Sequence, residues 1–421
     1  MEIEQAKLQV IQAGKMLCEN GLIQRTWGNV SCRIDEEFFA ITPSGRDYLS
    51  LTPEDIVVVN IQDLTYAGEI KPSSEKGIHA ACYRLRGDVN FVIHTHQTYA
   101  SLAGLSGRDI NGLTGESEKV IGSNVPLASY GLPGTGKLRE GVIAALQRST
   151  SKAVLMHHHG ALCLGGSLEE AFRVASALEN VCKQTLFDRY TELTGKTAES
   201  FTSLCEYVAE TRKKGVDYFV FPAYDSERHF DTVTLTPAKG GDPVEVDIRT
   251  GLPLDRCIDA PEAALLHSMI YRKRGDVNAI LHSTEPATVA VSGIGATVKP
   301  FLDDFAQITG VNLKTASFYG NAPRRAAKKV VKKLRGRNAV MLKNSGALCV
   351  GSTEDDAQAV KLVTEKGCMA YVAADVYGKE DERINFAECL LMRVVYKTKY
   401  SKKAEQNKKG VNNASPAQIH T

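Results

Sequence analysis

The sequence predicts an α/β protein in which one domain occurs twice in tandem. The segment "HAACYRLRGDVNFVIHTH" (79–96) matches "HSMIYRKRGDVNAILHST" (267–284) at an offset of 188, and "KAVLMHHHGALCLGGSLEEA" (152–171) matches "NAVMLKNSGALCVGSTEDDA" (338–357) at an offset of 186. Such self-similarity at a nearly constant spacing indicates a duplicated domain. In each copy, segments of helical periodicity alternate with short β-branched segments, which indicates the α/β class.

The predicted elements follow one another in the same order in both copies. A helix containing "IHAACYRLR" (78–86) ends at an Arg-Gly-Asp turn, where Gly87 can adopt a positive φ, and a strand follows over 89–95. A second strand, 153–156, leads through a glycine-rich turn into a helix that Ser167 and Glu170 would open as a capping box. The opening helix and strand region, 1–45, has no evident counterpart in the second half.

The domain boundaries are predicted from changes in composition. The polar segment 194–251 contains "KTAES", "TRKKG" and "KGGDP" and forms the junction between the copies. We expect an active domain at 1–212, a degenerate domain at 213–398 and a basic, disordered tail at 399–421.

The composition excludes several classes of protein. The chain has 421 residues with 51 Lys and Arg against 49 Asp and Glu, so a net charge of +2 predicts no nucleic-acid binding. Neither a signal peptide nor an apolar run of about eighteen residues is evident, which predicts a cytoplasmic protein without a membrane span. The ten cysteines are scattered and form no C-x-x-C pair, as is typical of buried apolar side chains.

Histidines at the ends of two strands predict a metal site. His94 and His96 project from the same face of a strand because successive side chains alternate. A third imidazole would come from "LMHHHG" (155–160), although spacing leaves His157, His158 and His159 open. Three imidazoles with one open position suit a catalytic Zn²⁺ ion.

The segment "KPSSEKGIH" (71–79) predicts an anion site beside an acid/base. Ser73 and Ser74 offer hydroxyls and backbone amides at a helix start, where the helix dipole favours anions. Glu75 in the same turn could transfer protons next to a metal ion.

The second copy is an internal control for these residues. It replaces Ser73, Ser74, Glu75, His96 and His159 by Pro261, Glu262, Ala263, Thr284 and Ser345, while "RGDVN" and "GALC" persist. Residues that only supported the fold would be needed in both copies, so this polar set is predicted to be functional. His79 and His94 persist as His267 and His282, and His79 is therefore predicted to be structural.

Five ordered motifs resemble the class II aldolase/adducin family. They are "GNVS" (28–31), "ITPSG" (41–45), "KPSSE" (71–75), "HTH" (94–96) and "HHG" (158–160). The resemblance implies two tandem class II aldolase-like domains, each a central, mainly antiparallel β-sheet flanked by helices. The second half resembles a degenerate copy without the metal ligands.

The family resemblance also implies roles for individual residues. His94, His96 and His159 would bind a divalent metal, Zn²⁺ or alternatively Mn²⁺ or another ion, and Glu75 would be the acid/base. The substrate phosphate would be held by Asn29, Ser44, Gly45, Ser73 and Ser74. Tyr130 in "VPLASYG" (125–131) would protonate the departing aldehyde from a neighbouring subunit, unless Tyr319 takes its place.

The implied function is a metal-dependent aldolase that cleaves a ketose 1-phosphate or a similar hydroxy-ketone by retro-aldol chemistry. The expected partners are a small-molecule sugar phosphate and a second copy of the chain, giving a dimer with four aldolase-like lobes. One alternative is another metal-dependent C–C lyase, hydrolase, decarboxylase or epimerase that acts on an oxo-compound. The other is a non-catalytic, adducin-like scaffold.

One further motif is not expected to bind a nucleotide. "GLPGTGKL" (131–138) is close to the phosphate-binding pattern G-x-x-x-x-G-K-[ST], but Leu138 stands where a hydroxyl must bind Mg²⁺.

Overall fold

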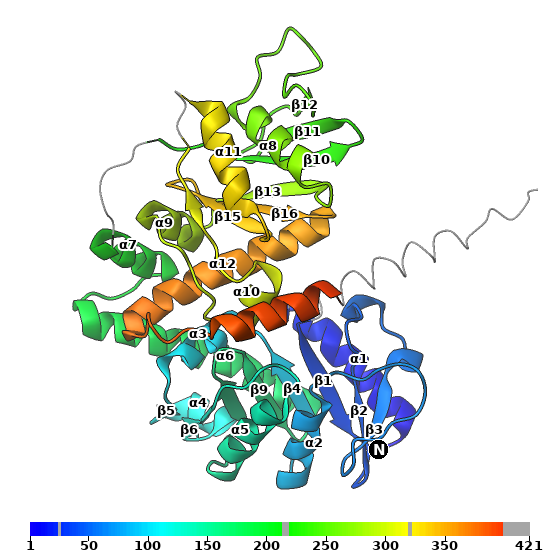
Figure 1. The fold of residues 1–421 in the computed structure, drawn as a ribbon. Helices are drawn as coiled ribbons and strands as arrows, with labels where there is room; N and C mark the ends of the chain where they lie inside the picture. Colours follow the sequence, from blue (N-terminus) through cyan, green and yellow to red (C-terminus); the bar gives the residue numbers. More distant parts are fainter. Residues whose placement is uncertain (24–26, 213–218, 319–321, 399–421) are drawn as a thin grey trace, which may run out of the picture. The chain divides into compact units, whose positions relative to one another are not determined.

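The computed structural model describes residues 1–23, 27–212, 219–318 and 322–398 (Figure 1). Tyr319 and the tail at 399–421 lie outside the described residues. The chain divides into two compact units, Met1–Lys214 with Lys366–Glu382 and Gly215–Glu365 with Arg383–Thr421. The first unit therefore includes a segment from the far end of the second repeat.

The first unit is built on a seven-stranded sheet of order β3-β2-β1-β4-β9-β8-β7. All neighbouring strands are antiparallel except β7 and β8, which are parallel. The strands are β1 (Gly28–Arg33), β2 (Phe38–Ile41), β3 (Val57–Asn60), β4 (Phe91–Thr95), β7 (Leu127–Ala128), β8 (Ala153–Met156) and β9 (Ala161–Gly165), with a separate pair β5 (Ile110–Asn111) and β6 (Asn124–Val125). Its helices are α1 (Ile3–Glu19), α2 (Lys76–Leu85), α3 (Thr98–Ala103), α4 (Gly115–Ile121), α5 (Gly136–Gln147), α6 (Leu168–Thr194) and α7 (Phe201–Arg212).

The second unit repeats this sheet in the order β12-β11-β10-β13-β16-β15-β14, again with one parallel pair, β14 and β15. The strands are β10 (Tyr224–His229), β11 (Thr232–Pro237), β12 (Val244–Asp247), β13 (Ala279–Ser283), β14 (Thr315–Ala316), β15 (Ala339–Leu342) and β16 (Ala347–Gly351). The helices are α8 (Glu262–Lys273), α9 (Pro286–Ile294), α10 (Asp303–Ile308), α11 (Pro323–Leu334) and the first part of α12 (Glu354–Tyr377), up to Glu365, with a further helix at 386–398. The prediction of two mainly antiparallel sheets flanked by helices is confirmed.

The structure identifies the counterpart of β1 to β3 that is not evident in the sequence. Ser31 on β1 lies opposite Val92, and Ser226 on β10 lies opposite Ile280, which is the repeat equivalent of Val92. Strands β10 to β12 are thus the copy of β1 to β3. In the described part of the second unit, no helix corresponding to α1 precedes β10.

Both faces of the first sheet are covered, and the site lies on one of them. Phe91 and Ile93 of β4 belong to the apolar cluster formed with α1 and α6, whereas Val92 belongs to the cluster formed with α2 and α5. Because side chains alternate along a strand, His94 shares the face of Val92. The start of α2 is therefore brought to the same face as the histidines.

Two local predictions need correction. Ser167 is the N-cap of α6, and its Oγ accepts from Glu170 N at 3.3 Å, but the Glu170 carboxylate accepts from Gly166 N, so the capping box is only half formed. Gly87 does not take a positive φ; α2 ends at Leu85, and its C-cap residue Arg86 is extended with φ −130°. Because an extended residue ends the helix, no glycine in a left-handed conformation is required.

Most of the cysteines are buried, as their scattered positions predicted. Eight of the ten cysteines are buried, Cys18 is half-buried and Cys257 is exposed. Among the described helices, none has both the length and the apolarity needed to cross a bilayer.

Candidate metal centre

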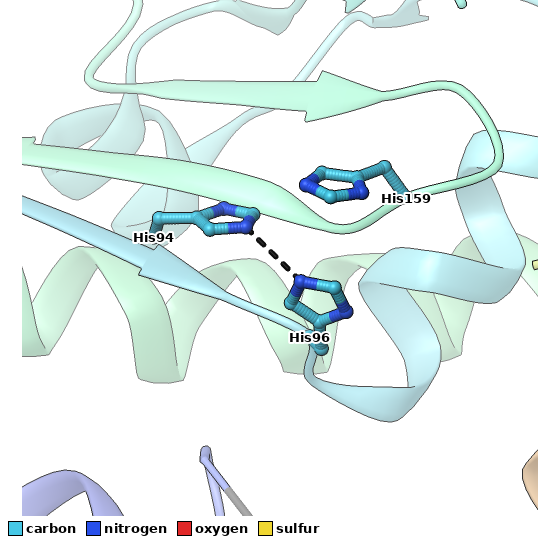
Figure 2. A group of neighbouring side chains, drawn as sticks. All are labelled: His94, His96 and His159. Atoms are coloured by element: carbon cyan, nitrogen blue, oxygen red, sulfur yellow. Dashed lines mark hydrogen bonds between the residues drawn. The ribbon is translucent and has the colours of Figure 1, made fainter. Parts of the chain in front are cut away.

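Three histidines converge at one end of the first sheet (Figure 2). His94 projects from β4, His96 follows two residues later, and His159 comes from the turn between β8 and β9. Their ligand atoms all lie within 4.8 Å of one another, and the Nε2 atoms of His94 and His96 are 3.1 Å apart. Within the described residues this is the only such group of three potential ligands.

The turn between β8 and β9 determines which of the three consecutive histidines joins the group. His158 adopts a left-handed conformation with φ 62°, and a Cβ on Gly160 would lie 2.1 Å from the carbonyl oxygen of Thr95. This turn delivers His159 to the group, while the rings of His157 and His158 stack with centroids 3.8 Å apart. Asn344 has the same conformation in the second copy, with φ 60°, so the turn belongs to the fold.

The chemistry of the three side chains fits a divalent metal ion. The Nδ1 of His94 donates to the carbonyl oxygen of Ala161 at 2.9 Å, which leaves its Nε2 lone pair for a ligand. Burial holds the pKa of His94 well below its ordinary value, so the imidazole is in the neutral form that binds metals. Imidazole nitrogens are ligands that Zn²⁺ and other transition metals prefer.

Glu75 contacts two of the three histidines. The residue immediately precedes α2 and is buried; its Oε1 lies 3.0 Å from His159 Nε2, and its Oε2 lies 3.3 Å from His94 Nε2 and accepts from Asn29 Nδ2 at 2.9 Å. Burial alone would raise the pKa of Glu75, but its interactions with the His94 and His159 rings and hydrogen bonds from His159 and Asn29 outweigh that effect. The pKa is therefore well below the ordinary value, and the carboxylate is ionised at rest.

Asn29 connects Glu75 to His79, an arrangement that the sequence did not reveal. The Oδ1 of Asn29 is hydrogen-bonded to Nε2 of His79, while Nδ1 of His79 lies 2.6 Å from Ser31 Oγ, which also contacts the hydroxyl of Tyr83 at 2.6 Å. Since an amide oxygen only accepts, Nε2 of His79 donates, and the Asn29 amide is oriented with its NH₂ toward Glu75. Asn29 lies directly opposite His94 in the strand ladder.

The second copy retains only the structural half of this network. His267 contacts Ser226 Oγ at 2.7 Å, and Ser226 Oγ lies 2.9 Å from the hydroxyl of Tyr271, but Nε2 of His267 has no hydrogen-bond partner among the described residues. Tyr224 occupies the position equivalent to Asn29. The predicted structural role of His79 is thus accompanied by a contact to Glu75 through Asn29.

The equivalent position in the second copy has different side chains and different hydrogen bonds. Ser345, the equivalent of His159, accepts through its Oγ from Phe221 N at 2.8 Å, and its carbonyl oxygen accepts from His282 Nε2 at 2.5 Å. The buried ring of Phe221 lies 6.2 Å from the ring of His282. His282, the retained equivalent of His94, therefore bonds a backbone carbonyl and lies near an aromatic ring.

The predicted substrate-binding segments lie side by side. Ser44 N donates to Lys71 O at 2.9 Å, and Ser73 N donates to Thr42 O at 3.1 Å. Ser73 is buried and its Oγ accepts from Glu75 N at 3.2 Å, while Ser44, Gly45 and Ser74 are exposed. Two motifs that are separate in sequence thus meet at the start of α2, where a helix favours an anion.

The glycine-rich segment 131–138 lies next to these residues. A Cβ on Gly134 would be 3.4 Å from Ser74 Cβ, and Thr135 is the N-cap of α5. Leu138 is buried in the core with α2, which explains an apolar side chain at that position. The ring of Tyr130 contacts the ring of His158 edge to face, with centroids 5.2 Å apart.

Several known proteins are similar to this chain. The 5-deoxy-D-ribulose 1-phosphate aldolase of Bacillus thuringiensis serovar kurstaki is 32% identical over 188 residues, which are 44% of this chain and 86% of that protein. The L-fuculose phosphate aldolase of Escherichia coli strain K12 is 34% identical over 179 residues, 42% of this chain and 81% of the relative. A solved structure of L-fuculose 1-phosphate aldolase is 30% identical and covers 49% of this chain and 95% of its own, with a TM-score of 0.42.

A family profile matches both repeats. The profile described as Class II Aldolase and Adducin N-terminal domain matches residues 8–186 and 224–372, which together are more than half of the chain. The two matched segments correspond to the two sheets, including the β10 to β12 region in the second. The protein therefore belongs to the class II aldolase and adducin N-terminal domain family and contains that domain twice.

Proposed function

We propose that the protein is a metal-dependent aldolase that cleaves a ketose 1-phosphate, or a similar hydroxy-ketone, at a single site in its first repeat. The observation that carries this proposal is the contact of the Glu75 carboxylate with two members of a three-histidine group. The similarity to two sugar-phosphate aldolases supports the substrate class. We assign catalysis to 1–212 and a supporting role to 213–398.

The proposed ligands are His94, His96 and His159, and the ion is Zn²⁺ or another divalent metal such as Mn²⁺. A bound ion would supply Lewis-acid polarisation of the substrate carbonyl. The protein contributes three imidazoles, and the ring of His94 is oriented by the Ala161 carbonyl oxygen. The second repeat, with Thr284 and Ser345 at equivalent positions, is assigned no ion.

The proton transfers are assigned to Glu75 and Tyr130. In a retro-aldol cleavage the departing carbon's hydroxyl loses its proton, the C–C bond breaks, and its electron pair remains on the carbon next to the ketone, which then takes up a proton. Tyr130 of a neighbouring subunit, or Tyr319 in its place, is proposed to exchange the proton on the aldehyde oxygen. Glu75 is proposed to transfer the proton on carbon. No proton is gained or lost overall.

The substrate phosphate is proposed to bind at the start of α2. Ser44, Ser73 and Ser74 offer hydroxyls there, with Gly45 next to Ser44, and the helix dipole favours the negative charge. The backbone amides of Ser44 and Ser73 already donate to Lys71 O and Thr42 O. Asn29 is proposed to contribute, although its amide is engaged with Glu75 and His79 in the structure.

The test is an assay of dihydroxyacetone phosphate release from a panel of ketose 1-phosphates that includes L-fuculose 1-phosphate and 5-deoxyribulose 1-phosphate. Glu75→Gln is expected to reduce kcat/KM by about 10²-fold to 10⁴-fold, the range for loss of a general acid/base. His94→Gln is expected to lose both metal and activity. Its matched control is His282→Gln, the same change at the equivalent position of the second copy, which should retain both.

Two results would contradict the proposal. One is a Glu75→Gln protein that cleaves its substrate at the wild-type rate. The other is a wild-type protein that binds no Zn²⁺ or Mn²⁺ and cleaves none of the panel, which would favour a non-catalytic scaffold.

A further inference from the structure

We propose that Lys366, from the long helix of the second repeat, is a positioning residue that holds the metal ligand His96 in place. This inference rests on the proposed metal site. Lys366 lies in α12, and the segment Lys366–Glu382 belongs to the first compact unit. Its Nζ donates to the carbonyl oxygen of His96 at 2.8 Å, across 270 positions of sequence.

His96 needs such a partner because it lies beyond the strand that supports His94. The last residue of β4 is Thr95, which pairs with Gly28 on one side and Ala161 on the other. His96 follows that last pair and is half-buried, whereas His94 lies inside the ladder and is fully buried. The backbone of His96 is therefore held by the Lys366 side chain where the ladder has ended.

The buried carboxylate of Glu179 interacts both with Lys366 and with the chain just after His96. Glu179 of α6 accepts from the backbone amides of Tyr99, at 2.7 Å, and Ala100, at 3.0 Å, at the start of α3 just after His96. Burial raises the pKa of Glu179, and attraction to Lys366 opposes that rise. The ammonium group thus donates to a carbonyl and is attracted by a carboxylate, which both stabilise its charge.

A comparison of the two repeats shows that the carboxylate supports the fold in both copies, whereas the lysine does not. Glu365, the repeat equivalent of Glu179, likewise accepts from the amides of Ala287, at 3.0 Å, and Thr288, at 2.9 Å, at the start of α9. The carboxylate is therefore part of the fold in both copies. The lysine is not: the residue of α6 equivalent to Lys366 is Asn180, and the equivalent of His96 is Thr284. Of these two equivalent helix positions, the lysine occurs only in α12, where it contacts a histidine.

The test is the affinity of the full chain for Zn²⁺, measured by competition with a chromophoric chelator after removal of bound metal. Lys366→Met keeps the length of the side chain and removes its charge and its donors. Loss of a group that orients a metal ligand typically weakens binding by about 10-fold to 100-fold, and at least about tenfold is expected here. The absorption spectrum of the Co²⁺-loaded protein should also change, which reports ligand geometry without any assay of activity.

Two variants serve as controls. Lys361→Met makes the same change in the same helix, where the ammonium lies 3.9 Å from Glu285, and it should alter Zn²⁺ affinity by less than about twofold. Lys366→Arg retains charge and donors and should bind Zn²⁺ more tightly than Lys366→Met. If Lys366→Met does not fold, Lys366→Gln, which keeps a donor without the charge, replaces it in the comparison.

The outcomes distinguish this inference from the proposed function. Wild-type affinity and an unchanged Co²⁺ spectrum in Lys366→Met would overturn the role of Lys366 and leave the metal site intact. A wild-type chain that binds no ion would overturn the metal site and this inference with it. Equal weakening in Lys366→Met and Lys361→Met would also overturn the inference, because a general effect on α12 would then explain both.

Discussion

His79 and His267 occupy equivalent positions in the two repeats, yet their environments differ in one contact. Both rings bond a serine through Nδ1, and a tyrosine hydroxyl lies close to each serine. Only His79 has Asn29 beyond it, and through Asn29 the carboxylate of Glu75. A residue retained for packing can therefore also orient a neighbour that is retained in only one copy.

The buried His267 predicts a dependence of stability on pH. Burial lowers its pKa from 6.5 to about 3, so between these values the unfolded chain binds a proton that the folded chain does not. Its stabilising contribution is complete above pH 6.5 and is lost as the pH falls, at up to about 1.4 kcal/mol per pH unit. Denaturant unfolding followed by circular dichroism from neutral to acid pH should show a shallower loss in His267→Gln than in the wild type. Identical slopes would show that the ring is protonated in the folded state.

At the scale of single elements, the turns that follow β8 and β15 each require a glycine, but only the turn after β8 carries a histidine of the metal group. A Cβ on Gly160 would lie 2.1 Å from Thr95 O, and one on Gly346 would lie 1.9 Å from Ser283 O. Such distances are too short for any side chain. Each glycine therefore permits the close approach of a turn to the end of the neighbouring strand.

These two glycines make a matched pair of variants. Gly160→Ala and Gly346→Ala should each reduce the free energy of unfolding by at least about 1–3 kcal/mol, the usual effect of overpacking. Only Gly160→Ala should also lose bound metal, because His159 precedes that glycine directly. Calorimetry and atomic absorption measure the two effects. Retention of full metal content by Gly160→Ala would contradict the role assigned to this turn.

At the scale of the whole molecule, the two repeats do not divide the chain as simply as their sequences suggest. Helix α12 begins in the second unit, and its C-terminal part, from Lys366, belongs to the first. Arg212, at the end of α7, forms ion pairs with Asp375 at 2.7 Å and Glu380 at 2.9 Å. Tyr377 in the same segment is buried.

A chain that ends at residue 212 is therefore expected to be incomplete. Without Lys366–Glu382 it would expose apolar surface that this segment covers, and its melting temperature by circular dichroism should lie below that of the full chain. Arg212→Ala in the full chain is the control, because an exposed ion pair contributes only about 0–1 kcal/mol. A shortened chain that is monomeric and melts like the full protein would show that the first repeat is self-sufficient.

Much of the fold could be predicted because its signals are local. His94 lies on a strand and His96 directly after its end, so the two-residue period predicts that their side chains lie close together. Ser167 opens a helix through its own hydroxyl. The repeat adds information that one domain lacks, since Glu75 and His159 are replaced in the second copy while the surrounding packing residues persist.

The sequence by itself determined the duplicated α/β fold, the position of the histidines at strand ends and the loss of the polar set from the second copy, because periodicity and spacing are properties of neighbouring residues. The tertiary structure decided which of His157, His158 and His159 meets the others, through a left-handed residue and a glycine in one turn. It also joined Asn29 to Glu75, His159 to Glu75 and Lys366 to His96, which are 46, 84 and 270 positions apart. Contacts at such separations depend on how strands and helices pack together, and no local pattern encodes them.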